Sequence, residues 1–85
     1  SYPILDTLGW ILTQKGDHER GLPLLRNATA RSFNSPEIQY HYAKALFLAG
    51  EKQQAASILR QALMQGKIFS ESKDAKNLLN TIENL

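Results

Sequence analysis

One ten-residue stretch organises the chain, Leu8-Gly9-Trp10-Ile11-Leu12-Thr13-Gln14-Lys15-Gly16-Asp17, in which an apolar helical run is stopped by Gly-Asp. It returns in altered form as Tyr42-Ala43-Lys44-Ala45-Leu46-Phe47-Leu48-Ala49-Gly50-Glu51. A shift of 34 residues aligns the two stretches, and the match extends beyond them. Identical residues occur at the pairs Leu12/Leu46, Gly16/Gly50, Leu25/Leu59, Arg26/Arg60 and Ala28/Ala62. A period of this length predicts stacked helix-turn-helix repeats.

The bulk composition is that of one small globular domain. The chain has 85 residues, 42% of them hydrophobic and 21% charged, with a formal net charge of +2. Its basic residues are scattered among acidic ones, so a nucleic-acid-binding element is only a remote alternative and no nucleic acid is expected as a partner. The absence of cysteine excludes a disulfide framework and a thiol nucleophile, and it leaves the compartment open.

Targeting signals are missing from this stretch of sequence. No run approaches the roughly 18 apolar residues of a membrane span, so direct membrane insertion is not expected. The chain starts at Ser1 without an initiator Met or a signal peptide. We therefore expect a piece of a longer repeat protein, whose localisation this piece leaves unknown.

Apolar periodicity predicts five helices, over residues 3–15, 18–31, 36–49, 52–65 and 71–84. The expected stops are three glycines, Gly16, Gly50 and Gly66. In the last helix, apolar residues recur on one side only and the other side is polar. That asymmetry is typical of the helix that closes a repeat array.

Local signals mark where the second and third helices begin. Asp17 and Ser35 are expected N-caps, and Pro36 suits the first helical position. The second helix contains Gly21 and Pro23, and a proline within a helix removes one backbone hydrogen bond and crowds the preceding turn. This predicts a kink or a late start of that helix.

Helix pairs with this period resemble the tetratricopeptide repeat (TPR) family. The resemblance rests in the first repeat on Leu8, Gly9, Leu12, Gly16, Asp17, Gly21, Leu25 and Ala28, and in the second on Tyr42, Ala43, Leu46, Gly50, Glu51, Ala55, Leu59 and Ala62. It implies an all-α, right-handed α-α superhelix in a single domain, with repeats at 3–34 and 35–68 and a capping helix at 70–85. The family's usual Trp is replaced by Leu5 and Gln39, and its late Pro by Phe33 and Lys67.

A narrower resemblance links the chain to the C-terminal end of bacterial TPR proteins of exopolysaccharide export and envelope sorting (PEP-CTERM system, PrsT-like). It rests on the stretches 5–10, 21–25 and 36–41 and on a terminal helix led by Phe69. The resemblance implies a cell-envelope or periplasmic setting, with the cytoplasm as the alternative, and a role in holding an assembly together.

In the TPR family, the first helix of each pair lines a concave groove. The residues that fall on that face here are spaced i, i+4, i+7 in each repeat and are Asp6, Trp10, Thr13, Tyr40, Lys44 and Phe47. Three aromatic rings, one cation and one anion suit an extended peptide or a helix of a partner protein. The alternative is that Trp10 and Phe47 only pack between helices. The Lys, Asn and Arg arrangement that binds terminal carboxylates in some relatives is absent.

A second surface is expected on the first helix. Ile4, Leu8 and Ile11 are the repeat equivalents of residues that would pack on a preceding repeat. They should be exposed in this chain, where they would meet preceding repeats of the parent protein or drive self-association.

Residues suited to catalysis are not predicted to converge. Tyr40, His41, Tyr42 and Lys44 are close in sequence but point in different directions on a helix, and His41 is expected to be a partly exposed surface residue. His18 has no second histidine at ligand spacing. We expect no catalytic residue, metal or cofactor, and predict a non-enzymatic protein-interaction scaffold, with a purely structural cap of a longer array as the alternative.

Overall fold

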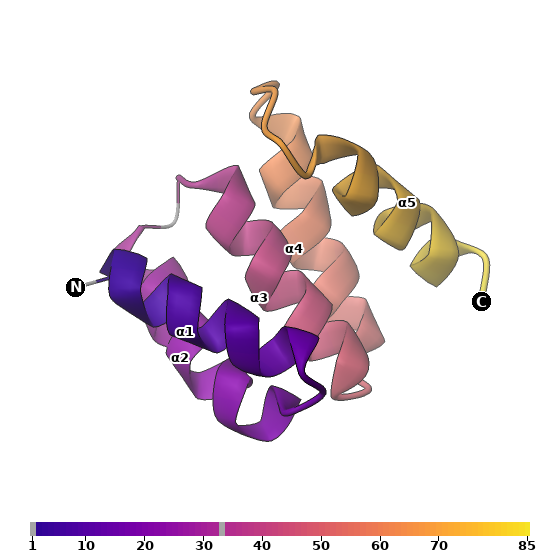
Figure 1. Ribbon diagram of the computed structural model, residues 1–85. Coiled ribbons are helices and arrows are strands. Elements are labelled where there is room, and N and C mark those ends of the chain that lie inside the picture. The colour runs from indigo at the N-terminus through magenta and orange to yellow at the C-terminus, as the bar shows by residue number, and fades with distance from the viewer. Residues whose placement is uncertain (1, 33) are drawn as a thin grey trace.

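The chain is a bundle of antiparallel helices. The computed structural model describes residues 2–32 and 34–85, and of Tyr2 only the backbone. These residues form five helices and no strand: α1 (Tyr2–Gln14), α2 (His18–Arg31), α3 (Pro36–Leu48), α4 (Lys52–Met64) and α5 (Ser72–Glu83), as Figure 1 shows. The all-α class is confirmed, and each helix begins and ends within one residue of its expected limits. The departure from the family at Phe33 lies outside the described residues.

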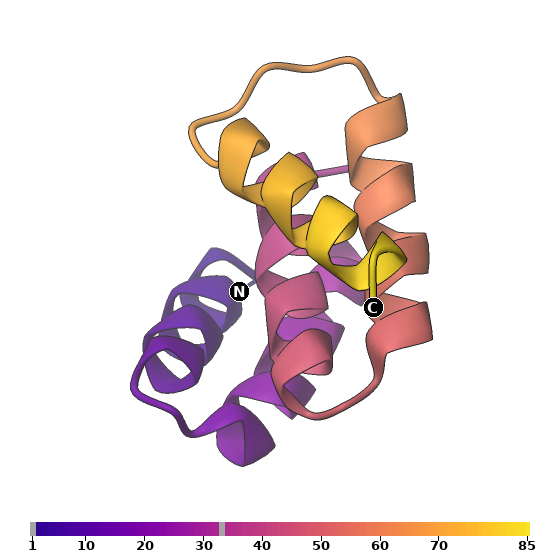
Figure 2. The same cartoon turned by 90° about the vertical axis from the view of Figure 1, so that its right-hand side faces the viewer.

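The helices are stacked in pairs. α1 packs on α2, α3 on α4, and α3 also touches α2 and α1, so the second pair lies against the first. α5 packs mainly on α4 and makes a smaller contact with α3. Figure 2 shows α5 crossing in front of α3 and α4, with the α1/α2 pair on the other side of α3. No helix among the described residues is long and apolar enough to cross a membrane.

The same turn ends the first helix of both pairs. Gly16 and Gly50 adopt φ angles of 89° and 87°, a region that glycine enters without steric cost. The Asp17 N–H donates to Leu12 O at 2.8 Å, and the Glu51 N–H donates to Leu46 O at 2.8 Å. Together with the glycine N–H bonds to the third carbonyl back, this is the Schellman arrangement. The stops predicted at Gly16 and Gly50 are confirmed, and the third glycine, Gly66, adopts a φ angle of 70° just after the end of α4.

The helix starts also follow the expected chemistry. The Asp17 carboxylate accepts a hydrogen bond from the Arg20 N–H, and the Ser35 hydroxyl accepts one from the Ile38 N–H, so both predicted caps are confirmed. α2 is helical from His18 onward, and the Gly21 N–H donates to Asp17 O at 3.0 Å. The late start is therefore wrong, because the first turn forms before Pro23 can interfere. A kink at Pro23 stays a prediction.

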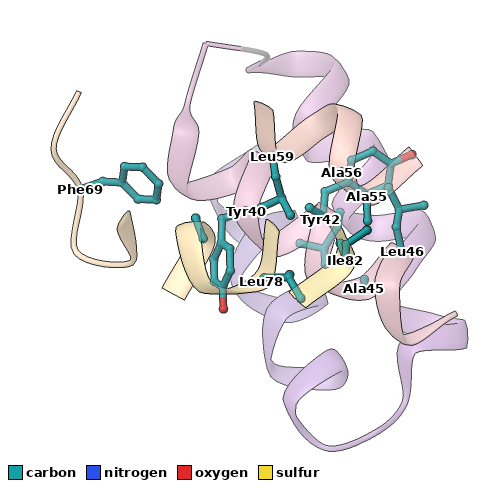
Figure 3. Packing of buried hydrophobic residues seen from close by; sticks show 13 residues of the cluster. Tyr40, Tyr42, Ala45, Leu46, Ala55, Ala56, Leu59, Phe69, Leu78 and Ile82 are labelled. Carbon is teal, nitrogen blue, oxygen red and sulfur yellow. The ribbon is translucent and has the colours of Figure 1, made fainter. Parts of the chain in front are cut away.

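The core lies between α2, α3, α4 and α5. Leu25, Leu46 and Leu59 are fully buried, and Phe69, from the segment between α4 and α5, turns inward to meet the same cluster (Figure 3). Small residues at equivalent positions of the two pairs are all buried: Gly9, Gly21, Ala28, Ala43, Ala55 and Ala62. Close approach of the paired helices depends on this lack of side-chain bulk.

Candidate binding groove

Two adjoining hollows lie between α1, α3 and α5. The first has a volume of about 450 Å³ and is lined by Trp10, Thr13, Gln14, Tyr40, Lys44, Leu48 and Asp74. The second has a volume of about 290 Å³ and is lined by Tyr40, Lys44, Phe47, Asp74, Asn77, Leu78 and Thr81. They share three residues, Tyr40, Lys44 and Asp74, and so form one continuous depression, hereafter the groove.

Five of the six predicted groove residues line it. Trp10 and Tyr40 are at the first hollow, Phe47 is at the second, and Lys44 borders both. Thr13 also borders the first, but it is buried: its hydroxyl donates to Gly9 O at 2.8 Å within α1 and lies against Gly21 of α2, so Thr13 contributes chiefly to the α1/α2 contact. The sixth, Asp6, is turned toward His41 instead.

The sequence interpretation missed the third wall of the groove. The second hollow is bordered by Asp74, Leu78 and Thr81 of α5. They lie 34 residues beyond Tyr40, Lys44 and Phe47 respectively. Applying the repeat shift once more would have found them. α5 therefore covers the core with one face and also occupies the groove position of a first helix.

His41 is the largest departure from expectation. It was predicted to be a partly exposed surface residue, but it is only 7% exposed. Its Nδ1 lies 2.7 Å from the Asp6 carboxylate of α1, and its Nε2 lies 2.7 Å from the Glu71 carboxylate, which directly precedes α5. The prediction of a partly exposed His41 is wrong, because carboxylates from elements remote in sequence cover the ring. We call these three residues the His41 bridge.

The geometry of the His41 bridge specifies its protonation. A neutral imidazole carries one N–H, so it can donate to only one of two flanking carboxylates. Both nitrogens here face ionisable oxygens, which favours the doubly protonated imidazolium. Burial by itself lowers the pKa of His41, but the hydrogen bonds and negative charges of Asp6 and Glu71 outweigh it, and the pKa is raised above 6.5.

Two aromatic rings surround the imidazole. Trp10 stacks on His41 with ring centroids 4.2 Å apart and planes 18° from parallel. Tyr40 is tilted against both, at 5.7 Å from Trp10 and 5.9 Å from His41. Burial, with smaller effects from the charges of Asp74 and Glu71, raises the pKa of the Tyr40 phenol to about 12. The base of the groove is therefore an aromatic cluster with a neutral phenol.

Opposite charges flank this aromatic base. Lys44 projects from α3 with its Nζ 5.8 Å from the centre of the Phe47 ring, a distance at which a cation is attracted to the ring face. Asp74, which is exposed on α5, borders both hollows together with Lys44. A bound segment would thus meet an aromatic surface with one cation and one anion beside it.

The His41 bridge is poorly arranged for catalysis or metal binding. A general base needs a free lone pair, whereas both nitrogens of His41 are engaged by carboxylates. The two carboxylates lie on different nitrogens of the ring, so they do not converge on one point. Within residues 2–32 and 34–85, no group of three His, Cys, Asp or Glu side chains could hold a metal ion.

A second surface lies on the outer side of α1. Ile4, Leu8 and Ile11 are 68%, 48% and 43% exposed, as predicted. With Pro3 and Thr7 they line an open apolar hollow of about 430 Å³. We call this surface the α1 apolar face.

The comparison with known families agrees with the stacked helix pairs. Residues 12–67, more than half of the chain, match the tetratricopeptide repeat family. The chain therefore belongs to the tetratricopeptide repeat family, whose members are generally non-enzymatic repeats that mediate protein-protein interactions. No match was found among curated proteins or among solved structures.

Proposed function

We propose that this chain is a non-enzymatic binding module that holds an extended peptide or a helix of a partner protein in the groove. The observation that carries the proposal is the repetition of the groove positions on α1, α3 and α5, so that one continuous depression is bordered by all three helices. Because each repeat contributes equivalent positions to the groove, the groove becomes longer as repeats are added. An elongated groove suits an extended ligand better than a small compact one.

The groove also has the composition of an interface. Trp10 and Tyr40 supply rigid aromatic area, a residue type enriched among the side chains that dominate binding energy. Lys44 on α3 and Asp74 on α5 add charges of opposite sign. We infer a ligand with apolar side chains that stack on the aromatic rings, flanked by an acidic group near Lys44 and a basic group near Asp74.

The test is affinity capture with the parent protein carrying single charge reversals. Lys44→Glu and Asp74→Lys should each lose a captured partner while the circular dichroism spectrum and the melting temperature stay as in the wild type. Lys52→Glu, at an exposed position at the start of α4, is the matched control and should retain it. The groove proposal is wrong if both groove variants capture the partner as the wild type does.

The α1 apolar face supports a second candidate function, a stacking surface for preceding repeats of the parent protein. Its equivalents one repeat later are Ile38, Tyr42 and Ala45, which are all buried. Hydrogen exchange in the parent protein tests this: α1 amides should be better protected there than in this chain. Equal protection in both would contradict stacking.

For the cellular setting we propose the envelope, within an export or sorting assembly. The only support is the narrower resemblance, which rests on residues 5–10, 21–25 and 36–41 and on the terminal helix led by Phe69. Fractionation of cells producing the tagged parent protein tests it, and recovery only in the cytoplasm would contradict it.

A further inference from the structure

We propose that His41 is a protonation-dependent positioning residue. As an imidazolium it ties α1 and α5 to α3 through Asp6 and Glu71 and thereby sets the width of the groove; as a neutral ring it releases one of these two walls.

The placement of the His41 bridge makes this possible. His41 lies in the middle of α3, and Figure 1 shows α3 between α1 and α5. Asp6 and Glu71 are 35 and 30 residues away in sequence, so each 2.7 Å contact joins a different wall to the central helix. α5 packs mainly on α4 and makes only a small contact with α3. The contact between Glu71 and His41 therefore adds a direct link between the start of α5 and α3.

Loss of one proton changes the charge balance of the His41 bridge. With an imidazolium the three groups sum to −1, and with a neutral ring to −2. The Asp6 and Glu71 side chains are only 16% and 22% exposed, so two carboxylates facing a neutral ring are incompletely compensated by water. One of them then loses its donor, because the neutral ring keeps a single N–H.

Glu71 is the carboxylate expected to leave. It is the more exposed of the two, it lies outside the helical body of α5, and its side chain makes no capping hydrogen bond there. Asp6 is held within the continuous helix α1. Deprotonation therefore opens the groove on the side of α5, the wall that carries Asp74, Leu78 and Thr81.

The charged groups around His41 are few. Asp6 faces it from α1 and Glu71 from the start of α5, while Lys44 on α3 and Asp74 on α5 border the adjoining groove. In the described part of the chain, α2 and α4 contribute no charge that acts on the ring. The raised pKa of His41 is thus caused by the two carboxylates that the bridge joins, against the opposing effect of burial.

This positioning role does not require that the groove bind a ligand. If the proposed function also holds, coupling follows by linkage: a ligand that fits the closed groove raises the proton affinity of His41, and protonation tightens ligand binding by the same factor. The coupling step alone rests on the proposed function.

The experiment needs no ligand. Ring ¹⁵N resonances of His41 report its protonation directly, and the emission of Trp10, the only tryptophan, reports it through the stacked rings. The chain has no cysteine, so Lys15→Cys and Asn80→Cys, both at exposed positions, allow nitroxide labels at the end of α1 and on α5. Spin-label distances are then compared below and above the observed midpoint of His41, with the far-UV spectrum as a check on folding.

We expect two protonated ring nitrogens and a narrow distance distribution below the midpoint, and a longer, broader distribution above it. Glu71→Gln, which keeps the size of the side chain, should lower the midpoint and remove the change in distance. His18→Gln, at the other histidine, is the matched control and should leave both unchanged.

His41→Gln should abolish the pH response. If it fails to fold, Glu71→Gln still decides the question, because its side chain is partly exposed. A His41 ring that carries one proton throughout, or a distance distribution that stays constant while the ring titrates, would overturn the proposal.

Discussion

At Gly21, the two helices of the first pair come closer than any larger residue allows. An added Cβ would lie 2.5 Å from Thr13 Oγ1 and 2.7 Å from the Gly9 carbonyl oxygen. The equivalent position in the second pair is Ala55, which is buried without difficulty. The repeat pattern by itself suggests that Gly and Ala are interchangeable here, and the neighbours on α1 show that they are not.

Overpacking a tight site usually costs about 1–3 kcal/mol, and alanine gains roughly 1 kcal/mol over glycine within a helix. Gly21→Ala should therefore lower the free energy of unfolding by up to about 2 kcal/mol. Urea denaturation followed by circular dichroism measures the difference.

The double variant Thr13→Ala/Gly21→Ala serves as the control. It removes the contact with the hydroxyl but keeps the contact with the Gly9 carbonyl, so stability should recover only in part. A single Gly21→Ala variant more stable than the wild type would contradict this account.

His41 gives the stability of the fold a pH dependence of known sign. Its pKa in the folded chain is raised above the 6.5 expected for an unperturbed side chain, so the folded state binds the proton more tightly than the unfolded state. The contribution of His41 is complete below about pH 6.5 and is lost as the pH rises through the folded-state pKa. Urea midpoints should therefore fall between pH 6 and pH 9, and the fall should be smaller in His41→Gln.

At the scale of the helix, the two pairs differ in how their second helices begin. Asp17 caps α2 with its side chain, and a hydrogen bond from Arg20 holds the pKa of its carboxyl below 3.8. Glu51, one repeat later, makes no side-chain cap at the start of α4. Aspartate reaches the N–H groups of the first turn well, whereas the longer glutamate is not among the favoured capping residues.

Exchanging these residues should shift stability in opposite directions. Glu51→Asp should raise the free energy of unfolding by about 0.5–1 kcal/mol by supplying the missing cap, and Asp17→Glu should lower it by about the same amount. Thermal melts of both variants measure the effects. Two variants that shift the melting temperature in the same direction would show that the caps are not the cause.

α5 is the element whose role the sequence described only in part. Its buried residues Ala75, Leu78 and Ile82 give the one-sided pattern from which a cap was predicted, and it does cover α4 and part of α3. Asp74 and Thr81 also place it at the groove. The division into repeats at 3–34 and 35–68 with a cap at 70–85 stays a prediction.

For the whole molecule, the α1 apolar face is the surface expected to govern association. An open apolar hollow lined by Ile4, Leu8 and Ile11 is typical of a surface that is covered in an assembly. Sedimentation velocity should detect concentration-dependent self-association of the isolated chain. Leu8→Lys should abolish it, because a charge at the middle of the face opposes its burial.

Met64→Lys is the matched control for this prediction. Met64 is 84% exposed at the end of α4, so it tests whether any exposed apolar side chain drives association. Equal loss of association in both variants, or a strict monomer at high concentration, would contradict a specific role of the α1 apolar face.

Much of the fold could be predicted because its signals are local or periodic. The helix limits, the caps at Asp17 and Ser35 and the turns at Gly16 and Gly50 depend on residues within one or two turns of each other. The groove positions on α1 and α3 followed from the resemblance to the TPR family, whose first helices line a groove, and the repeat shift gave their equivalence in the two pairs. The continuation of the groove onto α5 was not predicted, because the one-sided apolar pattern of α5 was interpreted only as that of a capping helix. The 34-residue shift was not applied to it.

The sequence alone determines the 34-residue period, the all-α class, the pairing of helices and the exposed face of α1. These features depend on helical periodicity and on the residues at helix ends, and both involve residues that are close together in the chain. Three-dimensional packing alone brings Asp6 and Glu71 to the two nitrogens of His41 and stacks Trp10 upon it. The physical reason is that the charge state of an imidazole depends on the groups within hydrogen-bonding distance. Here those groups come from α1 and from the residue that precedes α5, 35 and 30 residues away.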